Sequence, residues 1–184
     1  MIPAIILAAG SGRRMGGPKA LLIVGGESLL RRAVRTALGA GCSPVVAVVG
    51  TWDPNLGDLN VEIQVNSQAA EGMASSIRTG IAALPAEAEA ALLLAVDQPL
   101  VDEPLLRQLI ALAWLDPKRP AACAYGNTLG IPAVLPRRLF PALMDLRDDC
   151  GAKAILLREE AATLPFPEGG LDLDTVEDLE RFRR

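Results

Sequence analysis

Residues 5–19 read IILAAGSGRRMGGPK, an aliphatic segment that runs directly into a glycine-rich, basic loop. The aliphatic residues predict a short buried strand. Four glycines and a serine free the following backbone to approach an anion closely and to direct several N–H groups at it. Arg13, Arg14 and Lys19 add positive charge suited to a polyphosphate. Because ligands of open α/β sheets bind at the carboxyl ends of strands, we predict a phosphate-binding loop there.

The spacing of this loop departs from two common nucleotide-binding motifs. After Gly10 and Gly12, Met15 occupies the third glycine position of GxGxxG, and the GK[ST] of a P-loop is absent. The loop is therefore expected to bind phosphate in a different way. The alternative is a flexible glycine loop with solvated basic residues.

The rest of the chain repeats this alternation of strand and helix. Aliphatic runs at residues 44–50 and 91–96 are typical of strands covered on both faces. Helical patterns follow Ser28, span residues 73–84 and begin again after Asp102. From about residue 120, short candidate strands at 121–125, 133–135, 163–166 and 171–173 alternate with helical patterns at 137–146, 152–158 and 176–182. We predict a Rossmann-like, three-layer α/β/α fold with a mostly parallel sheet. No linker interrupts the chain, so residues 1–184 are expected to form a single domain.

The composition of the 184 residues excludes several classes of function. Without histidine there can be no Ser-His-Asp triad, no Cys-His nucleophile and no histidine-bound zinc. A net charge of −4 argues against a nucleic-acid partner. The apolar run at residues 2–9 is short and is not preceded by basic residues, as a signal peptide would be. No stretch approaches the roughly 20 apolar residues of a membrane span. With three dispersed cysteines that form no CxxC pair, a cytoplasmic location is expected.

Acidic residues suggest how a divalent cation could be held. Asp97 directly follows the aliphatic run LLLAV at the expected edge of the sheet. Mg²⁺ needs only one or two carboxylates in addition to phosphate oxygens, so Asp97 could anchor it. The alternative for Asp97 is a turn-forming role. Asp172 and Asp174 would share one face of a strand, and either could be the second carboxylate, while Thr175 fits a helix cap.

Small polar residues around position 72 form another candidate surface. A glycine leads into Ser75 and Ser76 at the start of a helical pattern, with Asn66 shortly before it. Such groups could hydrogen-bond a nucleotide base. Considered alone, this segment is more typical of ordinary helix capping.

Five segments in order resemble one family, the MobA-like nucleotidyltransferases, and within it the cytidylyltransferases of the molybdenum cofactor. The segments are LAAGSGRRMGGPK at 7–19, EGMASSIRTGI at 71–81, LLLAVDQPLV at 92–101, GIPAVLPRRLF at 130–140 and DLDTVEDL at 172–179. The first is shared by many nucleotidyltransferases. The second and fourth are closer to the cytidylyltransferase branch.

The resemblance implies a role for each matching residue. Arg14 would hold the β- and γ-phosphates, and Lys19 would reach the α-phosphate. Asp97 and Asp174 would together bind Mg²⁺. The catalytic residues would then be Lys19, Arg14 and Asp97. Guanylyl-transferring relatives have a glycine where this chain has Ala9, which favours CTP over GTP. The residues that would contact the nucleotide are Leu7, Ala8, Ala9, Gly10, Gly12, Arg14, Lys19, Asn66, Ser75, Ser76 and Asp97.

The activity implied by the resemblance is transfer of CMP from CTP to the terminal phosphate of molybdopterin, with release of pyrophosphate. That phosphate is ionised at neutral pH and needs no general base, in agreement with the lack of histidine. A molybdoenzyme or its chaperone could dock to receive the product. Three alternatives stay open: guanylyl transfer to the same cofactor, cytidylyl transfer to another phosphorylated small molecule, and a non-catalytic module that delivers the cofactor.

Overall fold

The computed structural model describes residues 1–12 and 16–171 of the chain. Arg14, Asp172, Asp174 and the helix expected at 176–182 lie outside these ranges.

A seven-stranded sheet forms the centre of the molecule, in the order β5-β4-β1-β6-β8-β7-β9. The strand β1 lies between β4 and β6 and is parallel to both, whereas β8 is antiparallel to its neighbours β6 and β7. The mostly parallel sheet predicted from the aliphatic runs is therefore confirmed. The strands are β1 Ala4–Leu7, β4 Val45–Val49, β5 Glu62–Val65, β6 Ala90–Ala95, β7 Ala121–Tyr125, β8 Thr128–Pro136 and β9 Ala162–Pro165.

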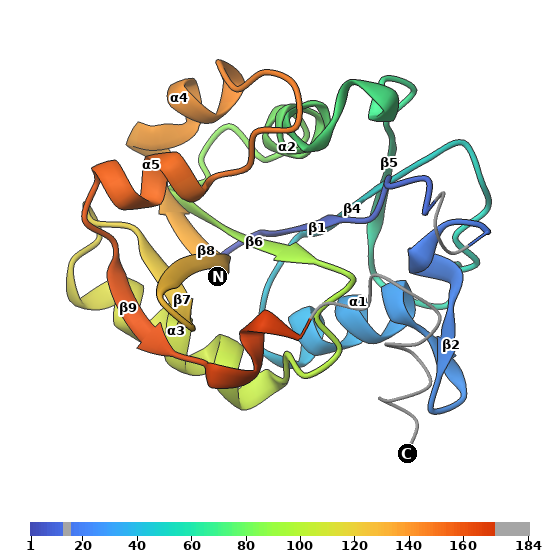
Figure 1. Cartoon of the computed structure of the whole chain (residues 1–184), viewed down its shortest axis with the longest axis horizontal. Coiled ribbons are helices and arrows are strands. Elements are labelled where there is room, and N and C mark those ends of the chain that lie inside the picture. Colours follow the sequence, from blue (N-terminus) through green and yellow to red (C-terminus); the bar gives the residue numbers. More distant parts are fainter. Residues whose placement is uncertain (13–15, 172–184) are drawn as a thin grey trace.

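Helices cover both faces of this sheet, which gives the predicted three layers (Figure 1). One face packs against α1 Leu29–Gly39 and α3 Glu103–Leu115. The other packs against α2 Met73–Ala82, α4 Phe140–Met144 and α5 Lys153–Arg158. The smaller elements are the hairpin β2 Ile23–Val24 with β3 Glu27–Ser28 and the 3-10 turns η2 Lys19–Leu21, η3 Ala69–Glu71, η4 Arg137–Leu139 and η5 Pro167–Gly170.

Successive residues of β1 supply two separate apolar layers. Ala4 and Ile6 pack on the side of α1 and α3, and Ile5 and Leu7 pack on the side of α2. This follows from the alternation of side chains along a strand. The second layer needs a small residue in α2, because a Cβ atom at Gly80 would lie 2.4 Å from Cγ2 of Ile5. Glycine at position 80 therefore lets α2 lie directly on β1.

Side-chain caps begin two of the helices. The Ser28 hydroxyl accepts a hydrogen bond from the Arg31 amide at 3.2 Å, and the Asp102 carboxylate accepts one from the Leu105 amide at 2.9 Å. Both satisfy amides that have no partner within the helix. The helix starts predicted after these two residues are thereby confirmed.

The sheet contains more strand than the aliphatic runs indicate. The edge strand β5 consists of the largely exposed residues EIQV and has no aliphatic run to mark it. The strand β8 starts at Thr128, five residues before the segment 133–135 that the sequence indicates. No helix within the described residues is both long and apolar enough to cross a membrane.

Candidate functional site

The loop that follows β1 folds back on itself at the carboxyl end of the sheet. The Ala8 amide still donates to the Val48 carbonyl at 2.8 Å, and the chain then leaves the sheet. Gly12 has φ +56°, and a Cβ atom there would lie 1.9 Å from the Gly17 carbonyl oxygen. Only glycine fits this close approach of two backbone segments. The glycine-rich sequence thus brings residues 10–12 next to the segment that carries Lys19.

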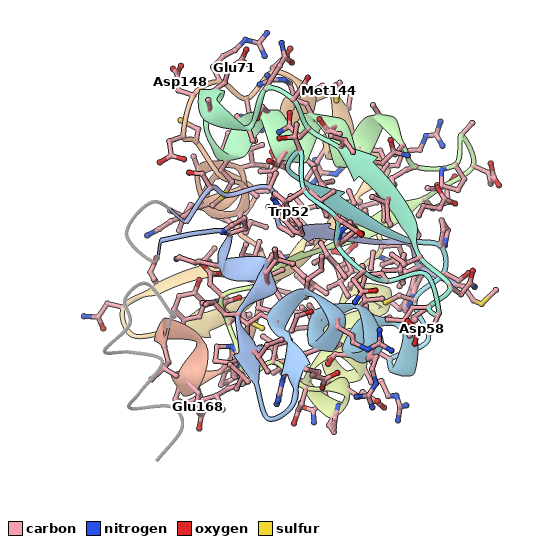
Figure 2. The ribbon with its side chains drawn as sticks, turned by 90° about the vertical axis from the view of Figure 1, so that its right-hand side faces the viewer. Trp52, Asp58, Glu71, Met144, Asp148 and Glu168 are labelled. Carbon is pink, nitrogen blue, oxygen red and sulfur yellow. The ribbon has the colours of Figure 1, made fainter. Side chains whose placement is uncertain are left out.

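Trp52 packs beside the same loop, just beyond the end of β4. A Cβ atom at Gly50 would lie 2.6 Å from the indole Nε1 of Trp52 and 3.5 Å from the Ala9 carbonyl oxygen. The indole is half-buried and contacts the layer on the side of α1. Figure 2 shows Trp52 near the centre of the molecule, between the labelled residues at its two ends.

Lys19 and Asp97 meet although 78 positions separate them in the sequence. The Lys19 ammonium donates to Oδ2 of Asp97 at 3.4 Å, and 21% and 29% of the two side chains are exposed. Lys19 begins η2, and Asp97 lies two residues after β6. A cation and a carboxylate, each within reach of solvent, therefore face one another at the edge of the sheet.

An open cleft with an empty volume of about 860 Å³ contains this pair. Of the residues expected to bind a nucleotide, those that line it are Leu7, Ala8, Ala9, Gly10, Gly12, Lys19, Ser76 and Asp97. Asn66 and Ser75 are not part of its lining, and Arg14 lies outside the described residues.

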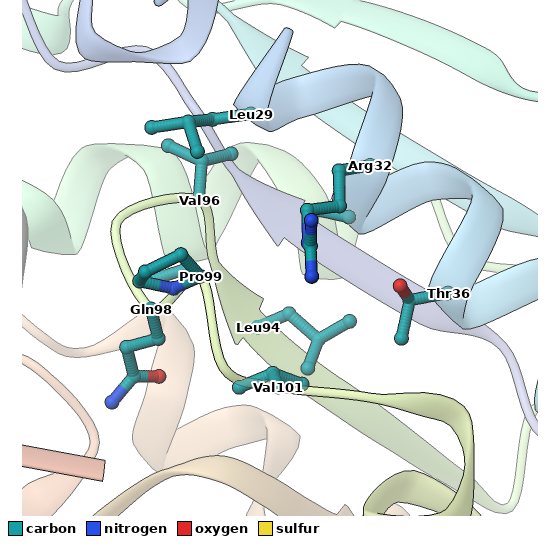
Figure 3. Close-up of a pocket in the computed structure, with 10 residues that line it drawn as sticks. Leu29, Arg32, Thr36, Leu94, Val96, Gln98, Pro99 and Val101 are labelled. Atoms are coloured by element: carbon teal, nitrogen blue, oxygen red, sulfur yellow. The ribbon is translucent and has the colours of Figure 1, made fainter. Parts of the chain in front are cut away.

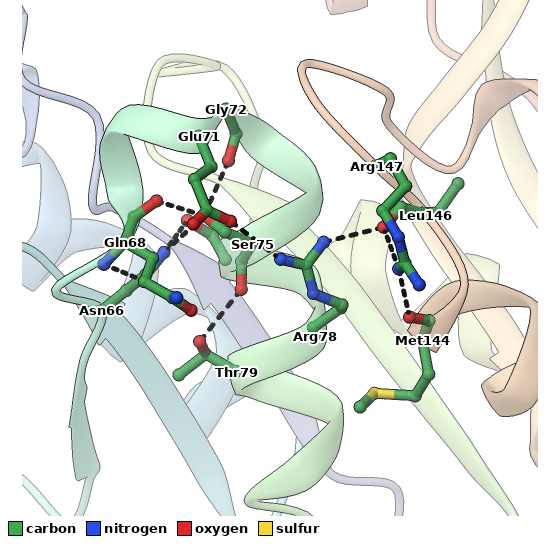
Figure 4. Close-up of polar contacts among 11 residues, drawn as sticks. Asn66, Gln68, Glu71, Gly72, Ser75, Arg78, Thr79, Met144, Leu146 and Arg147 are labelled. Carbon is green, nitrogen blue, oxygen red and sulfur yellow. Dashed lines mark hydrogen bonds and ion pairs between the residues drawn. The ribbon is translucent and has the colours of Figure 1, made fainter.

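Asn66 and Ser75 instead hold the start of α2 in place (Figure 4). The Asn66 amide nitrogen donates to the hydroxyls of Ser75 at 2.8 Å and Ser76 at 3.0 Å. The Ser75 hydroxyl contacts the carbonyls of Gln68 at 3.0 Å and Gly72 at 2.8 Å. Both Asn66 and Ser75 are buried, and the Asn66 amide holds Ser76, which borders the cleft.

A loop between α4 and α5 closes one side of the cleft, and sequence reasoning missed its contribution. The Met73 amide donates to the Asp149 carboxylate at 3.2 Å, and the Ala74 amide donates to the Asp148 carbonyl at 3.2 Å. Gly72, at φ +102°, has no room for a Cβ atom, which would lie 2.5 Å from that carbonyl oxygen. Asp149 thereby caps α2 and lines the cleft. Its only sequence signal was a pair of aspartates two positions before a glycine.

Arg78 of α2 also binds the loop between α4 and α5. Its guanidinium donates to the Leu146 carbonyl at 2.7 Å and to the Glu71 carboxylate at 3.2 Å (Figure 4). Figure 2 shows Glu71 and Asp148 at the same end of the molecule. The loop, α2 and η3 are therefore linked as one wall of the site.

A second cleft, with an empty volume of about 730 Å³, adjoins the first. The two share Met73, Ala95 and Asp97 in their linings. The second is formed by the edges of β7 and β8 and by the loop that leads into α5. It contains Tyr125, Thr128, Leu129, Gly130, Ile131, Gly151, Ala152 and Lys153. Asp97 thus lies where two separate ligands could meet.

Gln98, next to Asp97, connects the end of β6 to η5. Its amide nitrogen donates to the Gly169 carbonyl at 3.0 Å, while its buried Oε1 has no hydrogen-bond partner among the described residues. Gln98 also borders a narrow pocket under α1 with Leu29, Arg32 and Thr36 (Figure 3). Much of that lining is aliphatic and it includes no carboxylate, so the cleft around Asp97 is the better candidate for polyphosphate chemistry.

The residues of the cleft fit a hard divalent cation bound together with phosphates. Within the described ranges no three acidic or cysteine side chains gather into a complete metal site. Asp97 nevertheless offers a partly exposed carboxylate opposite the glycine-rich loop. Mg²⁺ commonly takes one or two carboxylates and completes its shell with phosphate oxygens and water. The donor set therefore suits a cation that arrives with a nucleotide.

Comparison with known proteins identifies relatives that span the whole chain. The model of the MobA-like NTP transferase domain matches residues 4–163. The nicotine blue oxidoreductase of Paenarthrobacter nicotinovorans is 33% identical over 98% of this chain and 96% of its own. The molybdenum cofactor guanylyltransferase of Rhodobacter capsulatus is 32% identical over 98% of this chain and 94% of its own.

Solved structures agree with the fold. The Rv0371C protein of Mycobacterium tuberculosis, solved in complex with manganese, has a TM-score of 0.80 and 25% identity, with 98% of this chain and 97% of that one covered. A nucleotidyl transferase of Methanothermobacter reaches a TM-score of 0.83 at 23% identity over 100% and 96% of the two chains. Because the names of the curated relatives refer to different reactions, the substrates have to be argued from the site.

Proposed function

The chain belongs to the MobA-like NTP transferase family, and from this premise we propose that it transfers CMP from CTP to the terminal phosphate of molybdopterin and releases pyrophosphate. The observation that carries the proposal is the contact of Lys19 with Asp97 at the junction of two clefts. A transfer reaction needs a donor and an acceptor that meet at one charged point. A module that only delivers a cofactor has no need for this arrangement.

In the proposed reaction an oxygen of the acceptor phosphate forms a bond to the α-phosphorus of CTP. The bond from that phosphorus to the β-phosphate oxygen breaks, and pyrophosphate leaves with the electron pair. The acceptor oxygen is already ionised, so no side chain has to remove a proton. Catalysis then consists of positioning the two phosphates and neutralising their charge.

The first cleft would hold the donor. The backbone N–H groups of residues 9–12, which border this cleft, would face the phosphates. Lys19 would reach the α-phosphate, and Arg14 would hold the β- and γ-phosphates. Asp97 and Asp174 would hold Mg²⁺, which supplies positive charge to the phosphate oxygens when bound. The second cleft would hold the acceptor.

The choice of CTP rests on the resemblance around Ala9, which is buried where the guanylyl-transferring relatives have glycine. Ser76, which is hydrogen-bonded by the Asn66 amide, would contact the base or ribose. Transfer of the product to a docked molybdoenzyme or its chaperone belongs to the same proposal.

The test is pyrophosphate release by the purified protein with Mg²⁺ and molybdopterin, with CTP, GTP and ATP compared in parallel. We expect a clear preference for CTP. Preference for GTP would instead favour guanylyl transfer to the same cofactor. Activity with CTP and a different phosphorylated acceptor would keep the proposed reaction and change only the identity of the acceptor. Nucleotide binding without turnover of any acceptor would favour the delivery module.

Two variants examine the residues at the junction. Lys19→Ala should lower kcat by about 10²–10³ if its ammonium stabilises charge in the transition state. Asp97→Asn should abolish Mg²⁺-dependent transfer while the circular dichroism spectrum stays that of the unmodified protein. Lys118→Ala, an exposed lysine beyond α3 that lines neither cleft, is the matched control. Near-normal turnover by Lys19→Ala would contradict the role given to this residue.

A further inference from the structure

The second cleft has an uneven distribution of charge. Among the side chains that line it, only Asp97 and Lys153 are charged within the described residues. Asp97 faces the junction with the first cleft, where Lys19 already contacts it. Lys19 itself is not part of the lining of the second cleft. Lys153 is therefore the cation that this cleft offers to an anionic ligand.

Most other cations of the described chain are occupied by partners of their own. Arg31 and Arg35 form ion pairs with carboxylates. Other arginines donate hydrogen bonds to backbone carbonyls in loops and at helix ends. The arginines engaged in one of these ways are Arg31, Arg35, Arg78, Arg107, Arg119, Arg137, Arg138, Arg147 and Arg158. No hydrogen bond or ion pair to a described residue engages the Lys153 ammonium. The Lys153 ammonium is therefore available to a ligand, whereas most arginines of the described residues already have partners.

The backbone of Lys153 is fixed relative to the nucleotide cleft. Ile155 and Leu156 of the same helix, α5, are buried in the layer shared with α2. The loop before it is held on α2 by the Asp149 carboxylate and by close contact of Gly151 with Met73, where a Cβ atom would lie 3.0 Å from the sulfur. The backbone at Lys153 is therefore held against α2 and the loop that also border the first cleft.

An acceptor phosphate meets an electrostatic obstacle at this site. It carries a charge of about −1.5 to −2 near neutral pH, and it has to approach both the Asp97 carboxylate and a triphosphate. Like charges brought together in a cleft repel unless a cation compensates them. Lys19 and Arg14 are assigned to the nucleotide, so the acceptor needs a cation from its own side.

We propose that Lys153 binds the phosphate group of the acceptor and sets the preference of the second cleft for phosphorylated substrates. This inference rests on the proposed function, since it takes the second cleft as the acceptor site. Lys153 contacts the acceptor before and during transfer and has no contact with the nucleotide. Its loss should weaken acceptor binding and leave nucleotide binding as it was.

Steady-state kinetics of Lys153→Ala provide the test, with Lys153→Arg as the charge-conserving variant. We expect Lys153→Ala to raise KM for molybdopterin by about tenfold to a hundredfold, the usual worth of a hydrogen bond to a charged group. KM for CTP should stay unchanged, and Lys153→Arg should recover most of the loss. Lys118→Ala again serves as the control. Equal KM values for molybdopterin in Lys153→Ala and the unmodified protein would overturn the inference.

A binding measurement separates this inference from the proposed function. Inorganic phosphate is titrated into the unmodified protein, Lys153→Ala and Lys19→Ala by calorimetry, with the nucleotide cleft saturated by CTP. Weaker phosphate binding in Lys153→Ala supports the inference even if molybdopterin proves to be the wrong acceptor. Unchanged phosphate binding in Lys153→Ala overturns it even if CMP transfer to molybdopterin is observed.

Discussion

At the scale of single residues, the Lys19 ammonium contacts Oδ2 of Asp97, the carboxylate that we propose to hold a divalent cation. The pair is partly exposed, and such pairs contribute about 0.2–1 kcal/mol. Lys19→Met should therefore raise the affinity of the nucleotide-free protein for Mn²⁺ by up to about fivefold, as measured by electron paramagnetic resonance of the unbound ion. Lys118→Met should leave the affinity unchanged. Weaker or equal Mn²⁺ binding in Lys19→Met would show that the ammonium does not compete with the metal.

Two buried cysteines make the free energy of unfolding depend on pH in the alkaline range. Burial raises the pKa of the Cys42 thiol from 9.0 to about 11 and that of Cys123 to about 12. Because the unfolded thiol ionises near pH 9 while the folded thiol stays protonated, the free energy of unfolding must fall as the pH rises from 9 to 11. For Cys42 the loss is on the order of 2 kcal/mol.

The variant Cys42→Ala isolates this effect. It loses some packing at every pH, but its free energy of unfolding should decline less steeply between pH 9 and 11 than that of the unmodified protein. Denaturant titrations at a series of pH values provide the comparison. Cys150→Ala removes an exposed thiol and should keep the original slope. Identical slopes for Cys42→Ala and the unmodified protein would contradict the argument.

At the scale of elements, Gly80 sets the contact between α2 and β1. Alanine inside a helix is usually more favourable than glycine by about 1 kcal/mol. Here the added Cβ atom would lie 2.4 Å from Cγ2 of Ile5, so Gly80→Ala should lower the free energy of unfolding by about 1–3 kcal/mol. Gly57→Ala, where nothing lies within 4 Å, should change it little. A Gly80→Ala protein of equal or higher stability would mean that α2 can move away from β1 without cost.

The elements also show how far the sequence predicts the fold. The strands β1, β4 and β6 were predictable because layers on both faces demand continuous aliphatic residues. The strand β5 was missed because an edge strand exposed on its sides needs no such run, and its residues Glu62–Val65 carry charged and polar groups. The predicted strand at 171–173 and the final helix lie largely outside the described residues.

The candidate site was predictable where it follows from strand ends and glycine spacing. Asp97 and the glycine-rich loop meet because β1 and β6 are parallel neighbours. Asp149 and Lys153 were missed because their position depends on how the loop after α4 packs on α2, 76 residues away in the chain. The buried places of Asn66 and Ser75 depend on the same kind of packing. That any of these residues contacts a nucleotide stays a prediction.

At the scale of the whole molecule, the expectation of a single domain can be examined through β6. Leu92 and Leu93 are adjacent and almost fully buried, yet they belong to the two opposite apolar layers. Each Leu→Ala substitution should cost about 2–5 kcal/mol. If the layers unfold together, both variants should show one calorimetric transition, shifted to lower temperature.

The exposed Leu115 provides the control for this pair of variants. It is 83% exposed, so Leu115→Ala should leave the transition temperature nearly unchanged. A second transition that is shifted in Leu93→Ala and constant in Leu92→Ala would show that the two layers unfold independently. The chain would then consist of more than one cooperative unit.

The position of Trp52 gives the protein an intrinsic optical probe. The chain has two tryptophans, and Trp114 lies half-exposed near the end of α3, away from the lining of both clefts. In a Trp114→Phe variant the remaining indole emission would come from Trp52, beside Gly50 and the Ala9 carbonyl. A nucleotide that binds against residues 8–12 should alter that emission as it binds, and a stopped-flow instrument can record the change. Association and dissociation of each nucleotide could then be timed separately from turnover, without an attached dye.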